Sequence, residues 1–227
     1  LRGFALLGIA IVNVPWIGSD RSLGTQLVED ALRAGLPWWD IAAAGLVEWL
    51  AEGKFYPQFA ALFGFGAGVM MTKSLSAQAR RLCVLLVFGL LHSAFGWWGD
   101  ILLNYALLGL LLLALHKAPP RVVFGLALVV YVVASVVSFL FDEWLVPASV
   151  ASAETLAYRA ENVRLYATGS FWEISVHRWD EAVLGFLMQW NWAYRLNTVA
   201  MGAFGLFVQR AGLLDDLGTK RRLLGRA

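Results

Sequence analysis

The sequence predicts an all-α fold: a polytopic helical membrane protein with about six transmembrane helices and amphipathic interfacial helices in two outer loops. Of its 227 residues, 59% are hydrophobic and only 15% are charged, and the mean hydropathy is +0.65. Soluble domains carry about 25% charged residues. The 11 tryptophans and 22 glycines are also typical of membrane proteins, which place aromatic residues at the interfaces and glycines at helix contacts.

Six apolar runs are the candidate transmembrane helices, and we expect them to form a single membrane domain over residues 1–227. A bilayer core requires about 20 apolar residues per helix, and flanking Trp, Lys or Arg residues extend the reach of a shorter run. The runs are Leu1–Trp16, Phe55–Met71 with Ile41–Leu50 as a weaker backward extension, Leu82–Trp97, Ile101–Leu115, Val122–Phe141 and Trp192–Val208. Within the first run, Pro15 is expected to kink or end the helix, which would leave Asn13 near an unwound outer end.

The distribution of basic residues predicts the orientation. With six spans, the connections Thr72–Arg81 and Lys117–Arg121 and the tail Arg210–Ala227 fall on one side. Together with Arg2 they carry 11 of the 18 basic residues but only 2 of the 16 acidic ones. The positive-inside rule makes this side, and both ends of the segment, cytoplasmic.

The two long outer loops are Gly18–Lys54 and Asp142–Met188. Both mix charges with apolar residues near helical spacing, which predicts amphipathic helices at the outer interface. We expect the sixth span to begin near Trp192, so that Arg195 reaches the outer headgroups.

The stretch GLLHSAFGWWGDILLNYALLG (89–109) holds an imidazole and a carboxylate in an otherwise apolar run. Two interpretations stay open. In the first, Asp100 caps the fourth helix and His92 makes an interhelical hydrogen bond. In the second, His92 is a general base, because imidazole exchanges a proton near neutral pH. We expect His92 to lie within reach of Asp100, directly or through water, and to face a protein-lined cavity rather than lipid.

Other kinds of site have less support. A metal site is not expected, because no second His or Cys lies at ligand spacing, and the single Cys83 cannot form an internal disulfide. The GxGxG pattern of Gly64, Gly66 and Gly68 lies inside an apolar run without a preceding strand. It therefore predicts close helix packing and not a nucleotide loop. No nucleic-acid partner is expected.

Four stretches resemble the bacterial YeiB-like family, domain of unknown function 418. They are LRGFALLGIAIVN at Leu1, GKFYPQFAALFGFGAG at Gly53, RRLCVLLVFGLLHSAFGWWGDILLNYALLG at Arg80 and YATGSFWEISVHR at Tyr166. The resemblance covers essentially the whole chain and implies a multi-pass bacterial plasma-membrane protein. Members of the family begin with a short basic segment and continue into further spans, so we expect this chain to be a segment of a longer protein.

The first span is also similar to those of membrane acyltransferases, including the lysosomal heparan N-acetyltransferase group. This resemblance implies transfer of an acyl group from cytoplasmic acyl-CoA, as co-substrate, to an extracytoplasmic or lipid-linked acceptor such as a lipid or glycan. His92 would deprotonate the acceptor and Asp100 would orient His92. The implied substrate-binding residues are Asn104, Tyr105, Asn13, Lys54 and Tyr56, and the implied partners of the CoA phosphates are Arg2, Arg80 and Arg81.

Alternatives remain for these residues and for the protein. The arginines are explained equally by topology, and Lys54 by an interfacial salt bridge with Glu48. A transporter or channel would use the same polar residues to line a path for a small solute. A structural membrane protein that binds lipid or a partner through its outer loops is a third class, and a homodimer is a further hypothesis.

Overall fold

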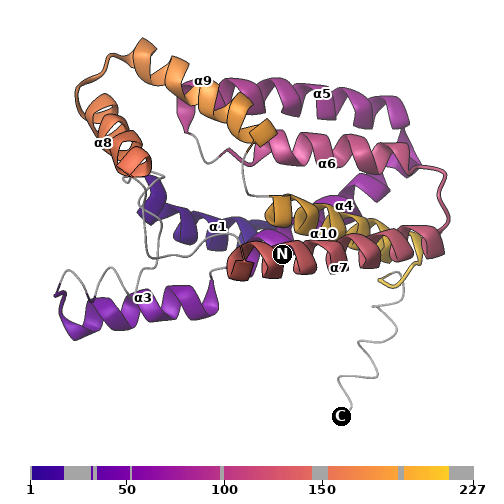
Figure 1. Cartoon of the computed structure of the whole chain (residues 1–227). Coiled ribbons are helices and arrows are strands. Elements are labelled where there is room, and N and C mark those ends of the chain that lie inside the picture. The colour runs from indigo at the N-terminus through magenta and orange to yellow at the C-terminus, as the bar shows by residue number, and fades with distance from the viewer. Residues whose placement is uncertain are drawn as a thin grey trace. The chain divides into compact units, whose positions relative to one another are not determined.

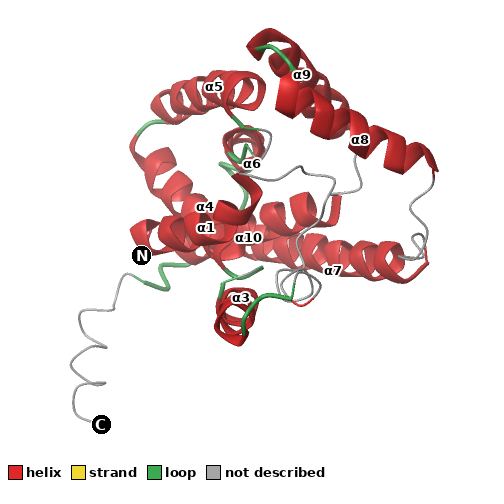
Figure 2. Ribbon diagram, turned by 90° about the vertical axis from the view of Figure 1, so that its left-hand side faces the viewer, coloured by secondary structure: helices red, strands yellow, loops and turns green. Residues whose placement is uncertain are grey.

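The computed structural model describes residues 2–17, 32, 35–51, 53–97, 100–144, 153–188 and 192–214. All regular elements in these ranges are helical, which confirms the all-α prediction (Figures 1 and 2). The helices are α1 (Arg2–Ile17), α3 (Trp38–Leu50), α4 (Phe55–Lys73), α5 (Leu75–Leu91), η2 (His92–Gly96), α6 (Leu102–Ala114), α7 (Pro120–Trp144), α8 (Ala153–Thr168), α9 (Phe171–Met188) and α10 (Trp192–Arg210).

Each of the six apolar runs coincides with a helix: α1, α4, α5 with η2, α6, α7 and α10. The two long segments between the apolar runs, which the sequence predicts to be outer loops, contain the helices α3, α8 and α9, as the spacing of their apolar residues predicts. Two helical segments, Leu75–Gly96 and Pro120–Leu140, are long and apolar enough to cross a membrane. The apolar segments Gly3–Val14 and Leu102–Ala114 are shorter. By length and composition alone, this pattern weakly indicates membrane association.

The predicted connection Thr72–Arg81 is almost entirely helical, and α4 and α5 are separated there by Ser74 alone. α4 ends at Lys73 and α5 begins at Leu75. The Oγ atom of Ser74, between them, accepts a hydrogen bond from the backbone N–H of Ala77 at 3.2 Å, which is the contact of an N-terminal helix cap. Basic residues in the following turns do not oppose a helix, because arginine and lysine are good helix formers.

Two further boundaries differ from the sequence predictions. The run Ile41–Leu50 belongs to a separate helix, α3, because Gly53 turns the chain before α4 with a φ of 70°. Glycine adopts this left-handed conformation without strain. α1 continues through Pro15 to Ile17, so Asn13 lies inside a helix and not at an unwound end. The missing N–H of Pro15 leaves the Ile11 carbonyl without its usual i→i−4 donor, a loss of one bond near the end of the helix.

By its internal contacts the chain forms two compact units, which are described separately. Unit 1 comprises Leu1–Tyr56, Leu91–Asp100 and Leu140–Gln189, and unit 2 comprises Pro57–Leu90, Ile101–Phe139 and Trp190–Ala227. In unit 1, α9 packs against η2 and α8. Also in unit 1, Gly8 of α1 lies against the ring of Phe55, whose centroid is 5.4 Å from that of Phe4.

Unit 2 is built around an apolar core. Its buried members are Ala60, Phe63, Ala67, Leu82, Tyr105, Leu108, Leu112, Val123, Ala127, Ala203 and Leu206. α4 and α10 approach each other at backbone distance, because a Cβ on Gly64 would overlap the carbonyl of Gly202. A Cβ on Gly68 would likewise overlap the side chains of Gln209 and Leu206 in α10. The predicted packing role of these α4 glycines is confirmed.

The sixth run begins at Trp192, as predicted. α9 ends at Met188, and residues 189–191 lie outside the described residues. Arg195 is half-buried. Its reach to the headgroups stays a prediction.

Candidate functional site

The end of α5 widens into a π-helix, η2, over His92–Gly96. The backbone N–H of Trp97 donates to the carbonyl of His92 at 3.0 Å, five residues earlier in the chain. A π-helical turn is rare and occurs frequently at functional sites. Here it begins with the histidine that the sequence singled out.

His92 and Asp100 are in direct contact, as the sequence predicts. The imidazole Nδ1 lies 2.9 Å from Oδ1 of the carboxylate. The side chain of Asp100 is 2% exposed and that of His92 is 45% exposed. A buried carboxylate accepts from Nδ1–H and thereby selects the tautomer whose Nε2 is the basic nitrogen. An accessible imidazole held in this way is arranged to take up a proton.

Asp100 lies before α6 and not within it. The residue directly preceding the helix is Ile101, which makes no capping bond with its side chain, and α6 begins at Leu102. A helix that included Asp100 would place Asn104 one turn further along the same face, and the later start of α6 removes this relationship. Asn104 is half-buried in α6, which belongs to unit 2.

Arg178 of α9 binds the last residue of the π-helix. Its Nη1 donates to the carbonyl of Gly96 at 2.8 Å. Its Nε donates to the hydroxyl of Tyr166 at 3.4 Å, and the guanidinium carbon lies 5.4 Å from the centroid of the same ring. Both helices of the second outer loop, α8 and α9, thus take part in this contact.

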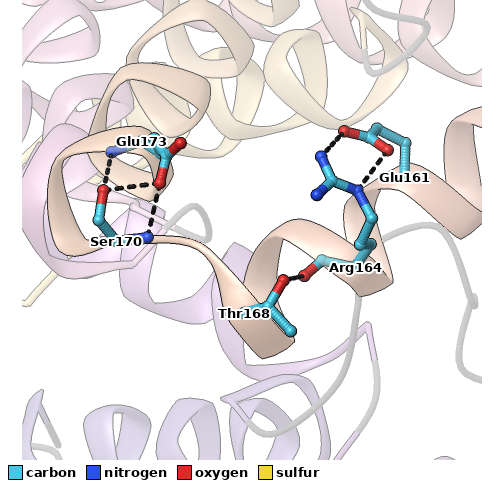
Figure 3. A network of polar contacts seen from close by, with 5 residues as sticks. All are labelled: Glu161, Arg164, Thr168, Ser170 and Glu173. Atoms are coloured by element: carbon cyan, nitrogen blue, oxygen red, sulfur yellow. Dashed lines mark hydrogen bonds and ion pairs between the residues drawn. The ribbon is translucent and has the colours of Figure 1, made fainter.

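The start of α9 is held by a reciprocal cap, drawn in Figure 3. The backbone N–H and the hydroxyl of Ser170 donate to Oε2 of Glu173 at 2.8 and 2.7 Å, and the N–H of Glu173 donates back to the Ser170 hydroxyl at 3.3 Å. This is the S-x-x-E capping box. The Ser170 backbone N–H, followed by its hydroxyl, lowers the pKa of Glu173.

The same view shows Glu161 and Arg164 of α8 paired one turn apart (Figure 3). Arg164 Nε donates to Oε2 of Glu161 at 2.9 Å, and this bond lowers the pKa of Glu161. Both side chains are well exposed, at 65% and 60%. Such a pair supports the helix and is not a buried site.

An exposed aromatic cluster joins η2 to the first turn of α9. The ring of Phe95 is stacked on that of Phe171 at 6.2 Å and meets Trp172 edge-on, also at 6.2 Å. All three side chains are exposed. Together with Arg178, this cluster fastens the π-helix to α9.

For the remaining predicted binding residues of unit 1, the structure gives the position and exposure of the side chains described below. Asn13 is half-buried in α1, Lys54 is exposed in the turn before α4, and Tyr56 is half-buried at the start of α4. Glu48, the alternative partner of Lys54, is half-buried in α3. The side chain of Arg2 lies outside the described part. Their roles in binding stay predictions.

In unit 2, Tyr105 is a core residue, 2% exposed, and its ring packs against Phe59 and Phe63 at 5.0 and 5.2 Å. Arg80 and Arg81 are exposed on α5. The Arg81 guanidinium lies 5.5 Å above the Phe63 ring and donates to Oε1 of Gln78 at 3.4 Å. Both arginines are accessible to an anion.

The chain is similar to proteins of known sequence but not of known structure. It is 33% identical to the uncharacterized protein YxaH of Bacillus subtilis over 188 residues, 78% of this chain and 46% of YxaH. It is 29% identical to the uncharacterized protein YeiB of Escherichia coli over 135 residues, 59% of this chain and 34% of YeiB. The chain is YeiB-like. It spans about half, or less, of the length of these curated relatives. No family model matches the chain, and no solved structure matches it.

The YeiB-like resemblance contained a signal that the sequence reasoning did not use. Arg178 ends the stretch YATGSFWEISVHR, and Gly96 lies in the stretch with His92 and Asp100. Sequence reasoning assigned Arg178 only to an interfacial helix and gave Gly96 no role. In the structure Arg178, the last residue of the first stretch, binds the Gly96 carbonyl in the middle of the second.

Proposed function

We propose that this chain is part of a multi-pass plasma-membrane acyltransferase, which moves an acyl group from cytoplasmic acyl-CoA to an extracytoplasmic or lipid-linked acceptor. The observation that carries the proposal is the contact of His92 with Asp100. A buried carboxylate bound to Nδ1 leaves Nε2 as the ring nitrogen that can accept a proton, on an imidazole that is 45% exposed.

The proposed step is nucleophilic attack on a thioester. His92 Nε2 takes the proton from an acceptor hydroxyl or amine, and the acceptor oxygen or nitrogen forms a bond with the thioester carbonyl carbon. The C–S bond then breaks, and the thiolate of CoA leaves with the proton that the imidazolium returns. Asp100 holds the ring and stabilises its protonated form. The products are the acylated acceptor and free CoA.

The membrane topology in this proposal has six spans, with both ends of the segment in the cytoplasm. The burial of the two long apolar segments supports it. Only 22% of the window in Leu75–Gly96 and 17% of that in Pro120–Leu140 are buried. Apolar surface left exposed on this scale requires an apolar surrounding. α7 illustrates this with Val129 and Phe139, which are 60% and 58% exposed.

Arg80, Arg81 and Arg2 are the proposed partners of the donor phosphates, which planar guanidinium groups bind in bidentate fashion. Asn13, Lys54, Tyr56, Asn104 and Tyr105 are the proposed acceptor-binding residues. Among them, Tyr105 requires a change in packing to meet a ligand, because it is buried in the core of unit 2. Lipid and glycan both offer the hydroxyl that the step needs.

The test is acyl transfer by the intact protein in proteoliposomes. Acetyl-CoA and a long-chain acyl-CoA, each labelled in the acyl group, are supplied together with bacterial membrane lipid and glycolipid. We expect label in the lipid or glycan fraction with the native protein, and loss of that label with His92→Gln. Failure of the native protein to transfer either acyl group would overturn the proposal. Solute or proton flux that depends on His92, without transfer, would favour a transporter.

A further inference from the structure

One edge of the His92 ring packs closely against Gly96. A Cβ at Gly96 would be 2.7 Å from Cδ2 and 3.1 Å from Nε2 of His92. Carbon atoms in contact are separated by about 3.5–4.0 Å, so a methyl group at this position would push the ring away. Asp100 therefore holds the ring at Nδ1, and the missing side chain of Gly96 leaves the space that the Cδ2 and Nε2 edge of the ring occupies.

The position of Gly96 depends in turn on Arg178. After Gly96 the chain becomes extended at Trp97, with φ −148° and ψ 136°. The carbonyl groups at the end of a helix have no intrahelical donor. Nη1 of Arg178 supplies a donor to the Gly96 carbonyl at 2.8 Å. A charge-assisted bond of this kind is stronger than one between neutral groups.

Arg178 is itself fixed from two directions. Its guanidinium is bound to the hydroxyl and lies over the ring of Tyr166 in α8. The helix that carries it starts at the capping box of Ser170 and Glu173. The contact between Phe95 and Phe171 fastens the same two elements at another point.

We infer that Gly96 and Arg178 are positioning residues, which together hold the His92 imidazole in the orientation that binds Asp100 and presents Nε2. The orientation of the ring is a property of the structure alone, whereas its use in acyl transfer rests on the proposed function. Arg178 acts through the Gly96 carbonyl. Gly96 acts through the absence of a side chain.

The experiment measures two quantities separately: the tautomer of the His92 ring by NMR and the rate of acyl transfer. The intact protein is labelled with ¹⁵N-histidine in nanodiscs, and His92→Gln identifies the His92 signals among those of the other histidines. We expect the native signals to report the Nδ1–H tautomer at neutral pH. In Gly96→Ala and Arg178→Gln we expect a mixture of the two ring tautomers. Arg178→Lys keeps one charged donor but not the planar contact with Tyr166, so an intermediate spectrum is expected.

The matched controls are Arg164→Gln, which removes an exposed arginine from α8, and Gly125→Ala, a helical glycine with no atom within 4 Å of the built Cβ. Neither should alter the His92 signals. In acyl transfer, Gly96→Ala and Arg178→Gln should lower the rate by on the order of 100-fold, the scale of a misplaced catalytic group.

Unchanged His92 signals in Arg178→Gln would overturn the inference, and this variant decides the question if Gly96→Ala does not fold. Changed signals in the two controls, at the same level, would also overturn it, because the effect would then be a general loss of structure. Changed signals only in the Gly96 and Arg178 variants, with no acyl transfer by the native protein, would uphold the positioning role and refute the proposed function.

Discussion

The carbonyl of Gly202 in α10 occupies the space that a side chain on Gly64 in α4 would need. The two helices therefore meet through their backbones, and the contact belongs to the core of unit 2. Small residues allow this approach in helical membrane proteins, where close van der Waals packing holds helices together.

Gly64→Ala should destabilise the protein by about 1–3 kcal/mol, the usual cost of overpacking. Gly125→Ala is the matched control, since a Cβ at Gly125 meets nothing within 4 Å. Alanine there should be neutral, or stabilising by up to about 1 kcal/mol through helix propensity. Thermal unfolding in detergent, followed by the fraction that remains monodisperse, measures both. Equal midpoints for the two variants would contradict the packing argument.

His92→Gln should lower acyl transfer by about 100- to 10,000-fold, the range that a general base contributes. Its thermal midpoint should stay close to the native one, because the His92 side chain is 45% exposed. Parallel measurements of transfer rate and midpoint separate a catalytic from a packing role. If rate and stability fall together, His92 serves packing. If neither changes, His92 is not the catalytic base.

Asp100→Asn should lower both stability and transfer. The side chain is 2% exposed, so the substitution alters a buried polar contact, and an amide cannot stabilise the imidazolium as a carboxylate does. Transfer should fall because the neutral amide no longer selects the Nδ1–H tautomer of His92 as a carboxylate does. An unchanged transfer rate in the folded variant would argue against Asp100 as the orienting group.

The capping box of α9 should weaken in acid. Because hydrogen bonds from Ser170 lower the pKa of Glu173 from its ordinary value of 4.5, the charged carboxylate stabilises the folded state at neutral pH. That contribution decreases as the pH falls from about 4.5 through the lowered folded-state pKa. The protection factors of the Phe171–Glu173 amides, that is, the exchange rates of the unfolded chain divided by the observed rates at the same pH, should therefore decrease in the native protein over this interval. Glu173→Gln should exchange faster at pH 7, with a smaller acid response. A native protein without that response would contradict the role of the charge.

The proposed topology places Ser76 in the cytoplasm and Ala167 on the outer side. With Cys83 replaced by alanine, single cysteines at these two positions are treated with a membrane-impermeant maleimide in intact spheroplasts. Both positions are exposed on the protein, so accessibility depends on the side of the membrane. We expect labelling at 167 in intact cells and labelling at 76 only after permeabilisation. The reverse pattern would invert the topology.

Much of the secondary structure follows from the sequence. Every apolar run coincides with a helix, and α10 begins at the predicted Trp192. The misplaced boundaries depend on particular residues. The Ser74 hydroxyl caps a helix that starts well before the apolar run, and α1 continues past Pro15. Apolar composition marks the segment that needs burial, whereas capping bonds determine where a helix ends.

The candidate site was predictable in part. His92 and Asp100 are eight positions apart, and two ionisable groups in one apolar stretch were enough to predict their contact. A helix beginning at Asp100 would place Asn104 one turn later on the same face, but α6 begins at Leu102. The π-helix at His92 was not predictable, because its one distinguishing bond, from Trp97 to the His92 carbonyl, depends on how the chain turns at that point.

The sequence by itself thus determined the helical class, the apolar segments and the pairing of His92 with Asp100, since each depends on residues close together in the chain. Only the tertiary structure decided that Arg178 binds Gly96 across 82 positions and that Gly202 faces Gly64. Periodicity shows that a helix has an apolar face but not which helix will cover it. That choice depends on the fit of side chains and backbones from distant segments, and it becomes defined only when the helices pack.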